Sequence, residues 1–221
     1  MGYVSIENTD RLFWLGRYTE RVYTTVKLFF ESFDKLIDSS EDAYKHFCAS
    51  LEIPDIYKDK EDFIMRYSLD KTNPDSIYSN LTRAFDNAIL LREEITSDTL
   101  AYIHLAMTEM AKAEGSSSPL MELQGVVDNI LAFWGIADDI IESENVRNLI
   151  KSGKRIERLD LYARLHKDQV SMIREIKRLK VRLTRTELEY DPAKVEEIEA
   201  LIEADQIDYN KVLQLTEALI S

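Results

Sequence analysis

Residues 13–28, Phe-Trp-Leu-Gly-Arg-Tyr-Thr-Glu-Arg-Val-Tyr-Thr-Thr-Val-Lys-Leu, decide how the rest of this chain is interpreted. Their centre is the box Gly16-Arg17-Tyr18-Thr19-Glu20-Arg21, and a similar box returns downstream as Gly153-Lys154-Arg155-Ile156-Glu157-Arg158. Residues three and four apart share one face of a helix, so each box presents its basic side chains and its glutamate together. Two such faces predict a paired polar centre between two helices of a bundle.

The composition favours an all-α protein. The chain has 221 residues, of which 45% are hydrophobic, enough to bury a real core. Only 6 Gly and 4 Pro are present, which leaves little material for the turns of a many-stranded protein. We therefore expect an all-α, elongated helical bundle that contains the repeated Arg/Glu box.

Periodic apolar residues place the helices. Ser5 is the expected N-cap of a long helix over residues 5–39, and residues 41–72 predict short helices joined by irregular chain. Asn73-Pro74-Asp75-Ser76 opens the next helix, with the proline in its first turn, and Thr96 or Ser97 caps a further one that ends near Ala113. Residues 120–142 and 144–167 predict two more helices, and the second of them carries the downstream box.

The C-terminal part of the sequence has a different character. Residues 147–190 carry 13 Lys and Arg against 6 Asp and Glu, whereas residues 191–221 carry 2 against 8. Apolar residues recur in both at the spacing of a coiled-coil seam, and Asp191-Pro192 marks a turn between them. We expect residues 168–221 to form an antiparallel hairpin of a basic and an acidic helix, packed on or extending a bundle of residues 1–167.

Several functional classes are disfavoured. The formal charge of −13 argues against a nucleic-acid partner, and no apolar run is long enough to span a membrane. The single cysteine and the lack of an N-terminal signal pattern predict a cytoplasmic protein. No phosphate-binding glycine loop is present, and the three histidines are too scattered to predict a metal site, so we expect no metal and no cofactor.

The polar residues that remain form one set of candidates for binding. They are Arg17, Glu20, Arg21, Arg83, Arg92, Glu93, Arg155, Glu157 and Arg158. One interpretation is a buried ion-pair network that holds long helices in register, since buried charges require partners. A second is a site for a carboxylate or another anion, held by arginine forks. A third is an enzyme in which Glu20 and Glu157 act as the catalytic acid and base.

The same residues carry a family resemblance. The segment Leu12-Phe13-Trp14-Leu15-Gly16-Arg17-Tyr18-Thr19-Glu20-Arg21 resembles the opening of the bacterial alpha-E domain family. The stretch from Asn73 to Glu93 resembles its second block, and residues 153–160 resemble its third. The resemblance covers residues 5–167, and the segment 168–221 is where the chain departs from the pattern.

The resemblance implies a helical bacterial protein whose genes lie beside, or are fused to, those of circularly permuted ATP-grasp ligase-like and transglutaminase-like proteins. It therefore suggests a non-enzymatic scaffold, or a protein partner, in a system that forms or modifies peptides. An ATP-grasp-like or transglutaminase-like protein is the expected partner, and contact between copies of the chain through helical faces is a further expectation. The alternative remains an enzyme or small-anion-binding protein that uses the Arg/Glu faces.

Overall fold

A computed structural model describes residues 4–38, 43–116 and 118–220 of the chain. This part contains eleven helices, and its only β-type pairing is an isolated bridge between Tyr190 and Ile220. The prediction of an all-α protein is confirmed. The chain forms two compact units: unit 1 comprises residues 1–20 and 142–221, and unit 2 comprises residues 21–141. The division into residues 1–167 and 168–221 that the sequence suggests stays a prediction.

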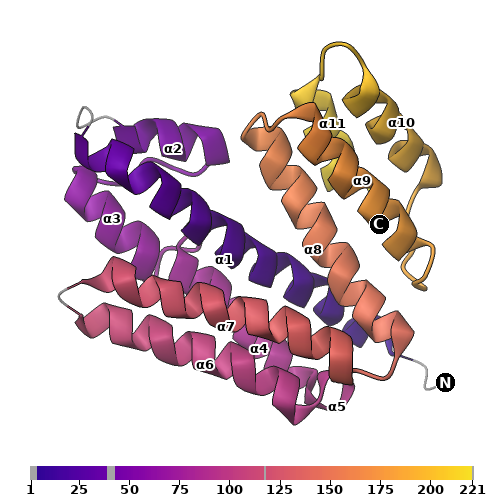
Figure 1. Ribbon diagram of the computed structural model, residues 1–221, viewed down its shortest axis with the longest axis horizontal. Coiled ribbons are helices and arrows are strands. Elements are labelled where there is room, and N and C mark those ends of the chain that lie inside the picture. The colour runs from indigo at the N-terminus through magenta and orange to yellow at the C-terminus, as the bar shows by residue number, and fades with distance from the viewer. Residues whose placement is uncertain (1–3, 39–42, 117, 221) are drawn as a thin grey trace. The chain divides into compact units, whose positions relative to one another are not determined.

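Unit 1 contains the first part of α1 and four later helices (Figure 1). The bounds are α1 Ile6–Asp38, α8 Glu144–Arg164, α9 Gln169–Leu183, α10 Pro192–Glu203 and α11 Tyr209–Glu217. Helix α1 begins as predicted, because the Ser5 hydroxyl accepts a hydrogen bond from the Asn8 amide at 3.1 Å. Its predicted end at Ser39 lies outside the described residues. Ser143 and Asp168 cap α8 and α9 in the same way, since each side chain accepts a hydrogen bond from an amide in the first turn.

Opposite charges join α9 to α10. Lys180 binds Glu199, and Lys177 lies 3.9 Å from Glu203. The Gln169 side chain, at the start of α9, donates to the carbonyls of Ile202 and Ala204 at the end of α10. The two helices therefore run antiparallel, with a basic helix against an acidic one.

The acidic segment differs from the expected single helix, because it forms the two helices α10 and α11. The backbone is extended at Ala204, and the Asp208 side chain accepts a hydrogen bond from the Lys211 amide to start α11. A continuous helix would also have carried Asp205 along the apolar seam, where burying a carboxylate is costly. Breaking the helix leaves Asp205 exposed.

Unit 2 contains the remainder of α1 and six further helices (Figure 1). The bounds are α2 Ala43–Leu51, α3 Lys60–Leu69, α4 Ile77–Leu90, α5 Arg92–Ile95, α6 Ser97–Gly115 and α7 Pro119–Ile140. Helices α6 and α7 lie side by side along their length. At one end of the unit, α1, α2 and α3 bury a cluster of aromatic rings around Phe63, which stacks on Tyr67 at 5.3 Å and on Tyr44 at 5.4 Å.

The start of α4 differs slightly from the prediction. Ser76 is its N-cap and accepts a hydrogen bond from the Ser79 amide at 3.0 Å, so Pro74 lies in the preceding turn rather than inside the helix. Thr96 is the N-cap of α6, as predicted, and it holds an unusual positive φ of 72°.

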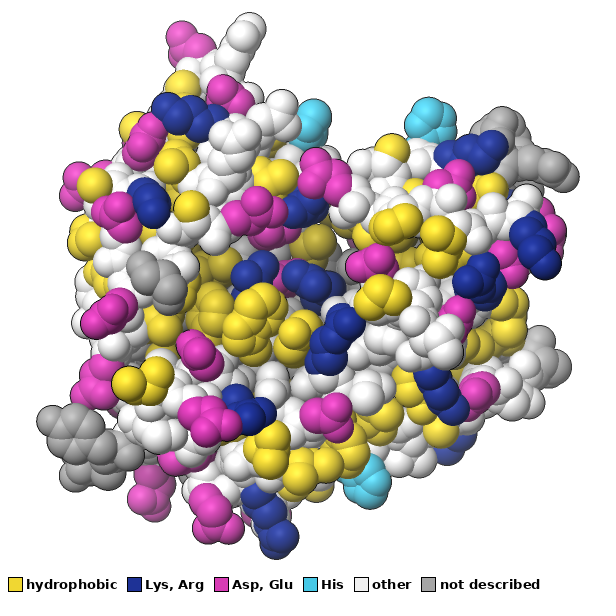
Figure 2. Space-filling view, turned by 180° about the vertical axis from the view of Figure 1, so that it is seen from behind, with side chains coloured by type: hydrophobic (Ala, Val, Ile, Leu, Met, Phe, Trp, Pro, Cys, Tyr) yellow, Lys and Arg dark blue, Asp and Glu magenta, His cyan; other side chains and the backbone are white. Residues whose placement is uncertain are grey.

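The exposed surface mixes both signs of charge. On the face shown in Figure 2, basic side chains stand among acidic and hydrophobic ones. Within the described residues, every helix is too short or too polar to cross a lipid bilayer.

Candidate functional site: a buried Arg/Glu clamp

The two boxes meet where α1 crosses α8 in unit 1, and a glycine from each helix allows a very close approach. A Cβ atom added at Gly16 would lie 2.0 Å from the carbonyl oxygen of Ile150, and one added at Gly153 would lie 1.9 Å from that of Phe13. Gly16 therefore faces Ile150, three residues before Gly153, and Gly153 faces Phe13, three residues before Gly16. The crossing is nearly symmetric, and only glycine fits on either side.

Beyond the crossing, each helix donates an arginine to the glutamate of the other. Arg17 Nε donates to Glu157 Oε2 at 2.7 Å. Arg158 binds Glu20 with two hydrogen bonds, from Nε at 2.6 Å and from Nη2 at 2.8 Å. We call these four residues the Arg/Glu clamp. Short, charge-assisted bonds of this kind are the strongest that side chains make, so the clamp fixes both the register and the angle of the two helices.

The clamp is closed to solvent on its acidic side. The side chains of Glu20 and Glu157 are 0% exposed, and those of Arg17 and Arg158 are 13% and 15% exposed. The Arg17 guanidinium also lies over the ring of Trp14, 4.7 Å from its centroid. A carboxylate buried to this degree is tolerated only with a hydrogen-bonded partner of opposite charge, which both glutamates have.

A third buried carboxylate, Glu175 of α9, extends the network, and the sequence analysis missed it. Its side chain is 0% exposed, and Arg155 donates to it at 2.6 Å and Arg178 at 3.1 Å. A signal was present, because Glu175 lies three residues after Met172 and four before Leu179, on the apolar stripe of its helix. A charge at such a position predicts a buried ion pair.

Burial and neighbouring charges shift the pKa values of several groups around the clamp, and the net direction differs from group to group. Burial alone would lower the pKa of Arg158, but the Glu20 carboxylate more than offsets it, and the net shift is upward. Burial lowers the pKa of Arg155, although Glu175 acts against it. Burial raises the pKa of Asp160, and the negative charge of Glu157 raises it further. Arg164 limits that rise through a hydrogen bond of 2.7 Å to Asp160.

Lys154 takes in α8 the place that Arg17 takes in α1, directly after the glycine of the box. Burial lowers the pKa of Lys154 to about 7, although the carboxylate of Glu20 acts in the opposite direction. Next to it along the helix are two buried polar atoms without a hydrogen-bond partner in the described structure, Ser152 Oγ and Arg155 Nε. In this part of α8, two buried polar atoms therefore make no hydrogen bond with the surrounding described residues.

The remaining candidate residues belong to unit 2 and make local contacts there. The carbonyl of Arg21 accepts from the Thr25 hydroxyl at 2.6 Å. Arg83 donates to the carbonyl of Pro74 at 2.8 Å, which fastens the turn before α4. Glu93 is exposed in α5, and Arg92 donates to the Ser97 hydroxyl at 3.0 Å. The role of all nine candidates in binding stays a prediction.

No group of His, Cys, Asp and Glu side chains within the described ranges is arranged to hold a metal ion. Unit 1 does contain arginine–carboxylate pairs, which can lock helices together or recognise another carboxylate.

Comparison with protein families gives one match, over residues 8–221, to Alpha-E, described as a predicted alpha-helical domain with a conserved ER motif. The chain belongs to the Alpha-E family. Two Glu-Arg pairs in this Alpha-E chain, Glu20-Arg21 and Glu157-Arg158, have the form of that motif, and both glutamates are members of the clamp. No curated protein and no solved structure matches the chain.

The Alpha-E match also corrects the extent of the resemblance. Its blocks in the sequence suggested that residues 168–221 depart from the family, whereas the match includes this segment. The contact of Glu175 with Arg155 gives a physical reason, because α9 supplies a carboxylate to the helix that carries the second box.

Proposed function

We propose that this Alpha-E protein is a non-enzymatic helical scaffold that acts as a protein partner in an ATP-grasp-linked system for forming or modifying peptides. The observation that carries the proposal is the complete burial of Glu20 and Glu157, each already bound to an arginine of the opposite helix. A catalytic acid or base must reach the proton it transfers, directly or through one water molecule. Two carboxylates with no exposed surface serve a structural role instead.

The choice of system rests on the family resemblance. The resemblance implies genes beside those of circularly permuted ATP-grasp ligase-like and transglutaminase-like proteins, and a helical protein whose two boxes are locked together suits the role of a docking partner. The proposal places the protein in the cytoplasm with the ligase. Self-association through helical faces is compatible with it and stays a prediction.

The direct test is binding of the purified chain to the purified ATP-grasp-like protein encoded nearest to it, measured by titration calorimetry and size-exclusion chromatography. We expect a complex of fixed stoichiometry, with peptide-bond formation only when the ligase is present. Turnover by the chain alone, or no complex with either the ATP-grasp-like or the transglutaminase-like protein, would overturn the proposal.

The clamp is tested separately through Glu157→Gln. A structural clamp predicts that this change lowers the free energy of unfolding by about 3 kcal/mol, because Arg17 loses its charged hydrogen-bond partner and keeps only the more distant carboxylate of Asp160, at 3.8 Å. The paired variant R17M/E157L removes both charges and should recover most of that stability. An enzyme that used Glu157 would instead lose turnover with little change in stability, and the paired variant would not restore it.

A further inference from the structure

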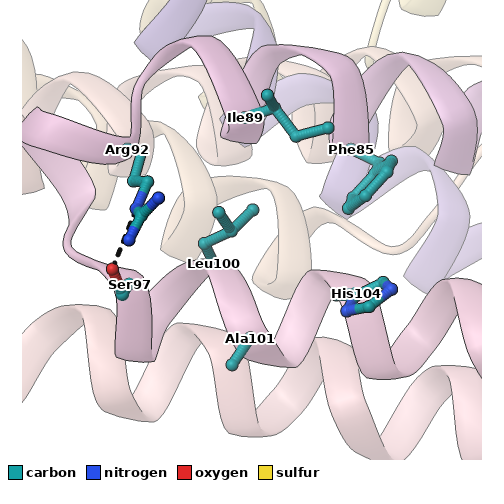
Figure 3. A pocket seen from close by; sticks show the side chains of 7 residues that line it. All are labelled: Phe85, Ile89, Arg92, Ser97, Leu100, Ala101 and His104. Carbon is teal, nitrogen blue, oxygen red and sulfur yellow. Dashed lines mark hydrogen bonds between the residues drawn. The ribbon is translucent and has the colours of Figure 1, made fainter.

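A pocket of about 300 Å³ lies in unit 2 between α4 and α6, remote in sequence from both boxes (Figure 3). We call it the α4/α6 pocket. It is lined by Phe85, Ile89, Arg92, Ser97, Leu100, Ala101 and His104. Its volume is at the lower end of the range of small-molecule sites, which suits a ligand of one or two residues' size.

One end of the pocket is polar and positive. Arg92 uses its Nε to hold the Ser97 hydroxyl at 3.0 Å, and this bond fixes the plane of the guanidinium (Figure 3). No ion pair of Arg92 is found among the residues that the structure describes, in contrast to the arginines of the clamp. The 19-residue helix α6 begins at Ser97, so the positive end of its dipole lies at the same end of the pocket.

The other end is apolar and aromatic. The rings of Phe85 and His104 stack with their centroids 5.5 Å apart and 20° between their planes. Between the two ends, Leu100 rises from α6, and Ile89 of α4 stands opposite with 47% of its surface exposed (Figure 3). The pocket therefore has an apolar floor, formed by Ile89, Leu100 and the ring pair, and one charged end at Arg92.

We propose that the α4/α6 pocket binds a carboxylate that carries an apolar or aromatic group, with the carboxylate at Arg92 and Ser97 and the apolar group against Phe85 and His104. A guanidinium with two unused amino groups donates to both oxygens of a carboxylate at once, and a nearby hydroxyl adds a third donor. The binding energy of the apolar group comes from covering Ile89, Leu100 and the ring pair.

The length of the pocket agrees with this ligand. Ser97 and His104 are seven residues apart on one helix, a rise of about 10 Å. An extended residue spans about 3.5 Å, so two residues span about 7 Å, and a bulky side chain on the ligand covers most of the remainder. Two sources offer this chemistry, namely the C-terminal residue of a peptide with an apolar side chain, and a free aryl-substituted acid. The proposal does not depend on the scaffold role, since it needs only unit 2.

The test measures the affinity of the full chain for N-acetyl-phenylalanine and for its C-terminal amide by NMR titration. We expect the acid to bind at least tenfold more tightly than the amide, with shifts centred on residues 85–104. Arg92→Gln should weaken binding of the acid at least tenfold and leave the amide nearly unaffected. His104→Ala should weaken both. Arg185→Gln is the matched control, because it removes an exposed arginine of unit 1 and should change neither affinity.

Equal affinity for acid and amide, or equal effects of R92Q and R185Q, would overturn the proposal. Thermal unfolding of each variant shows that it is folded, and Arg92 and His104 are exposed enough for replacement. Phenylpropionate distinguishes the two sources. A peptide site binds N-acetyl-phenylalanine more tightly than this free acid, because it also contacts the amide group, and a site for aryl acids shows the reverse order.

Discussion

The close crossing of α1 and α8 at Gly16 and Gly153 gives a sharp test of how unit 1 is held together. Replacing Gly16 by alanine puts a Cβ atom 2.0 Å from the Ile150 carbonyl oxygen, whereas real Cβ atoms essentially never come within 3.0 Å of such an atom. The obstructing atom belongs to a helix backbone and has no rotamer to change. The helices must therefore separate by at least about 1 Å or tilt by an equivalent amount.

The cost follows from what that separation does. Overpacking of a tight contact costs about 1–3 kcal/mol. The clamp bonds, now 2.6–2.8 Å long, would be stretched toward lengths at which hydrogen bonds fail, and each is worth about 1.5–3 kcal/mol. The higher helix propensity of alanine returns about 1 kcal/mol. We expect Gly16→Ala to lower the free energy of unfolding by about 3–5 kcal/mol, a large share of the stability of an ordinary domain.

The chain supplies its own controls. A Cβ atom at Gly135, inside α7, meets nothing within 4 Å, so Gly135→Ala should raise stability by about 0.5–1 kcal/mol. At Gly125 the nearest atom is Cγ of Glu109 at 2.8 Å, on a flexible side chain that can turn away. Gly125→Ala should therefore fall between the two extremes.

The assay is urea unfolding followed by circular dichroism, with a double-mutant cycle across the crossing. Once alanine at position 16 has parted the helices, alanine at Gly153 meets a gap that is already open, so the double variant should lose much less than the two single losses combined. A Gly16→Ala protein as stable as Gly135→Ala, or strictly additive losses at positions 16 and 153, would refute the close crossing.

Three further predictions use buried or strained groups. The pKa of Lys154 is about 7 in the folded chain, against an ordinary value of 10.5, so the folded state loses this proton first as the pH rises, and the free energy of unfolding should increase by about 2 kcal/mol between pH 7 and pH 9. Lys154→Met should abolish this increase, as measured by urea unfolding at several pH values. An unchanged dependence of stability on pH in the variant would contradict the lowered pKa of Lys154. Ser152→Ala removes a fully buried hydroxyl that finds no hydrogen-bond partner among the described residues, so it should raise the free energy of unfolding by about 1 kcal/mol. A loss of stability in the same assay would mean that the hydroxyl is hydrogen-bonded. Glu52 directly follows α2 and has a φ of 55°, a backbone conformation that favours glycine. Glu52→Gly should therefore stabilise the folded state by about 0.5–1 kcal/mol and raise the midpoint of thermal unfolding. A lower midpoint would show that the Glu52 side chain stabilises the fold by more than the backbone strain costs.

The sequence predicted the helices better than their contacts. Apolar periodicity and capping residues located the start of α1 and the bounds of α6, α7 and α8 to within a few residues, because these signals are local. The repeat of the box indicated that α1 and α8 carry matching polar faces. It did not indicate which arginine binds which glutamate, since Arg17 is also three residues from Glu20 on its own helix. The glycine crossing decides that choice by directing Arg17 to Glu157.

Other features depend on tertiary structure alone. Glu175 is the only acidic residue of the basic helix α9, and although its place on the apolar stripe indicated burial, the partner Arg155 is known only once α9 packs against α8. The α4/α6 pocket brings Phe85 and His104 together from two helices that no motif connects. The division of the acidic segment at residues 204–208 was missed because the apolar spacing continues through it while the backbone does not.

The route of the chain through unit 1 also sets the order of events during synthesis. The polypeptide leaves this unit after Glu20 and returns at Glu142, and the partners Arg17 and Glu157 are 140 residues apart. On the ribosome, residues 21–141 emerge with their own core complete and can fold as a unit, while the first helical turns of α1 wait for α8. A domain closed by its latest helices folds slowly, because so long a loop must close before its contacts form. We therefore expect the clamp to form late in synthesis, because Glu157 must leave the ribosome before it can bind Arg17. Slowing translation just before α8 should lengthen the time for which the start of α1 is open to chaperones and proteases.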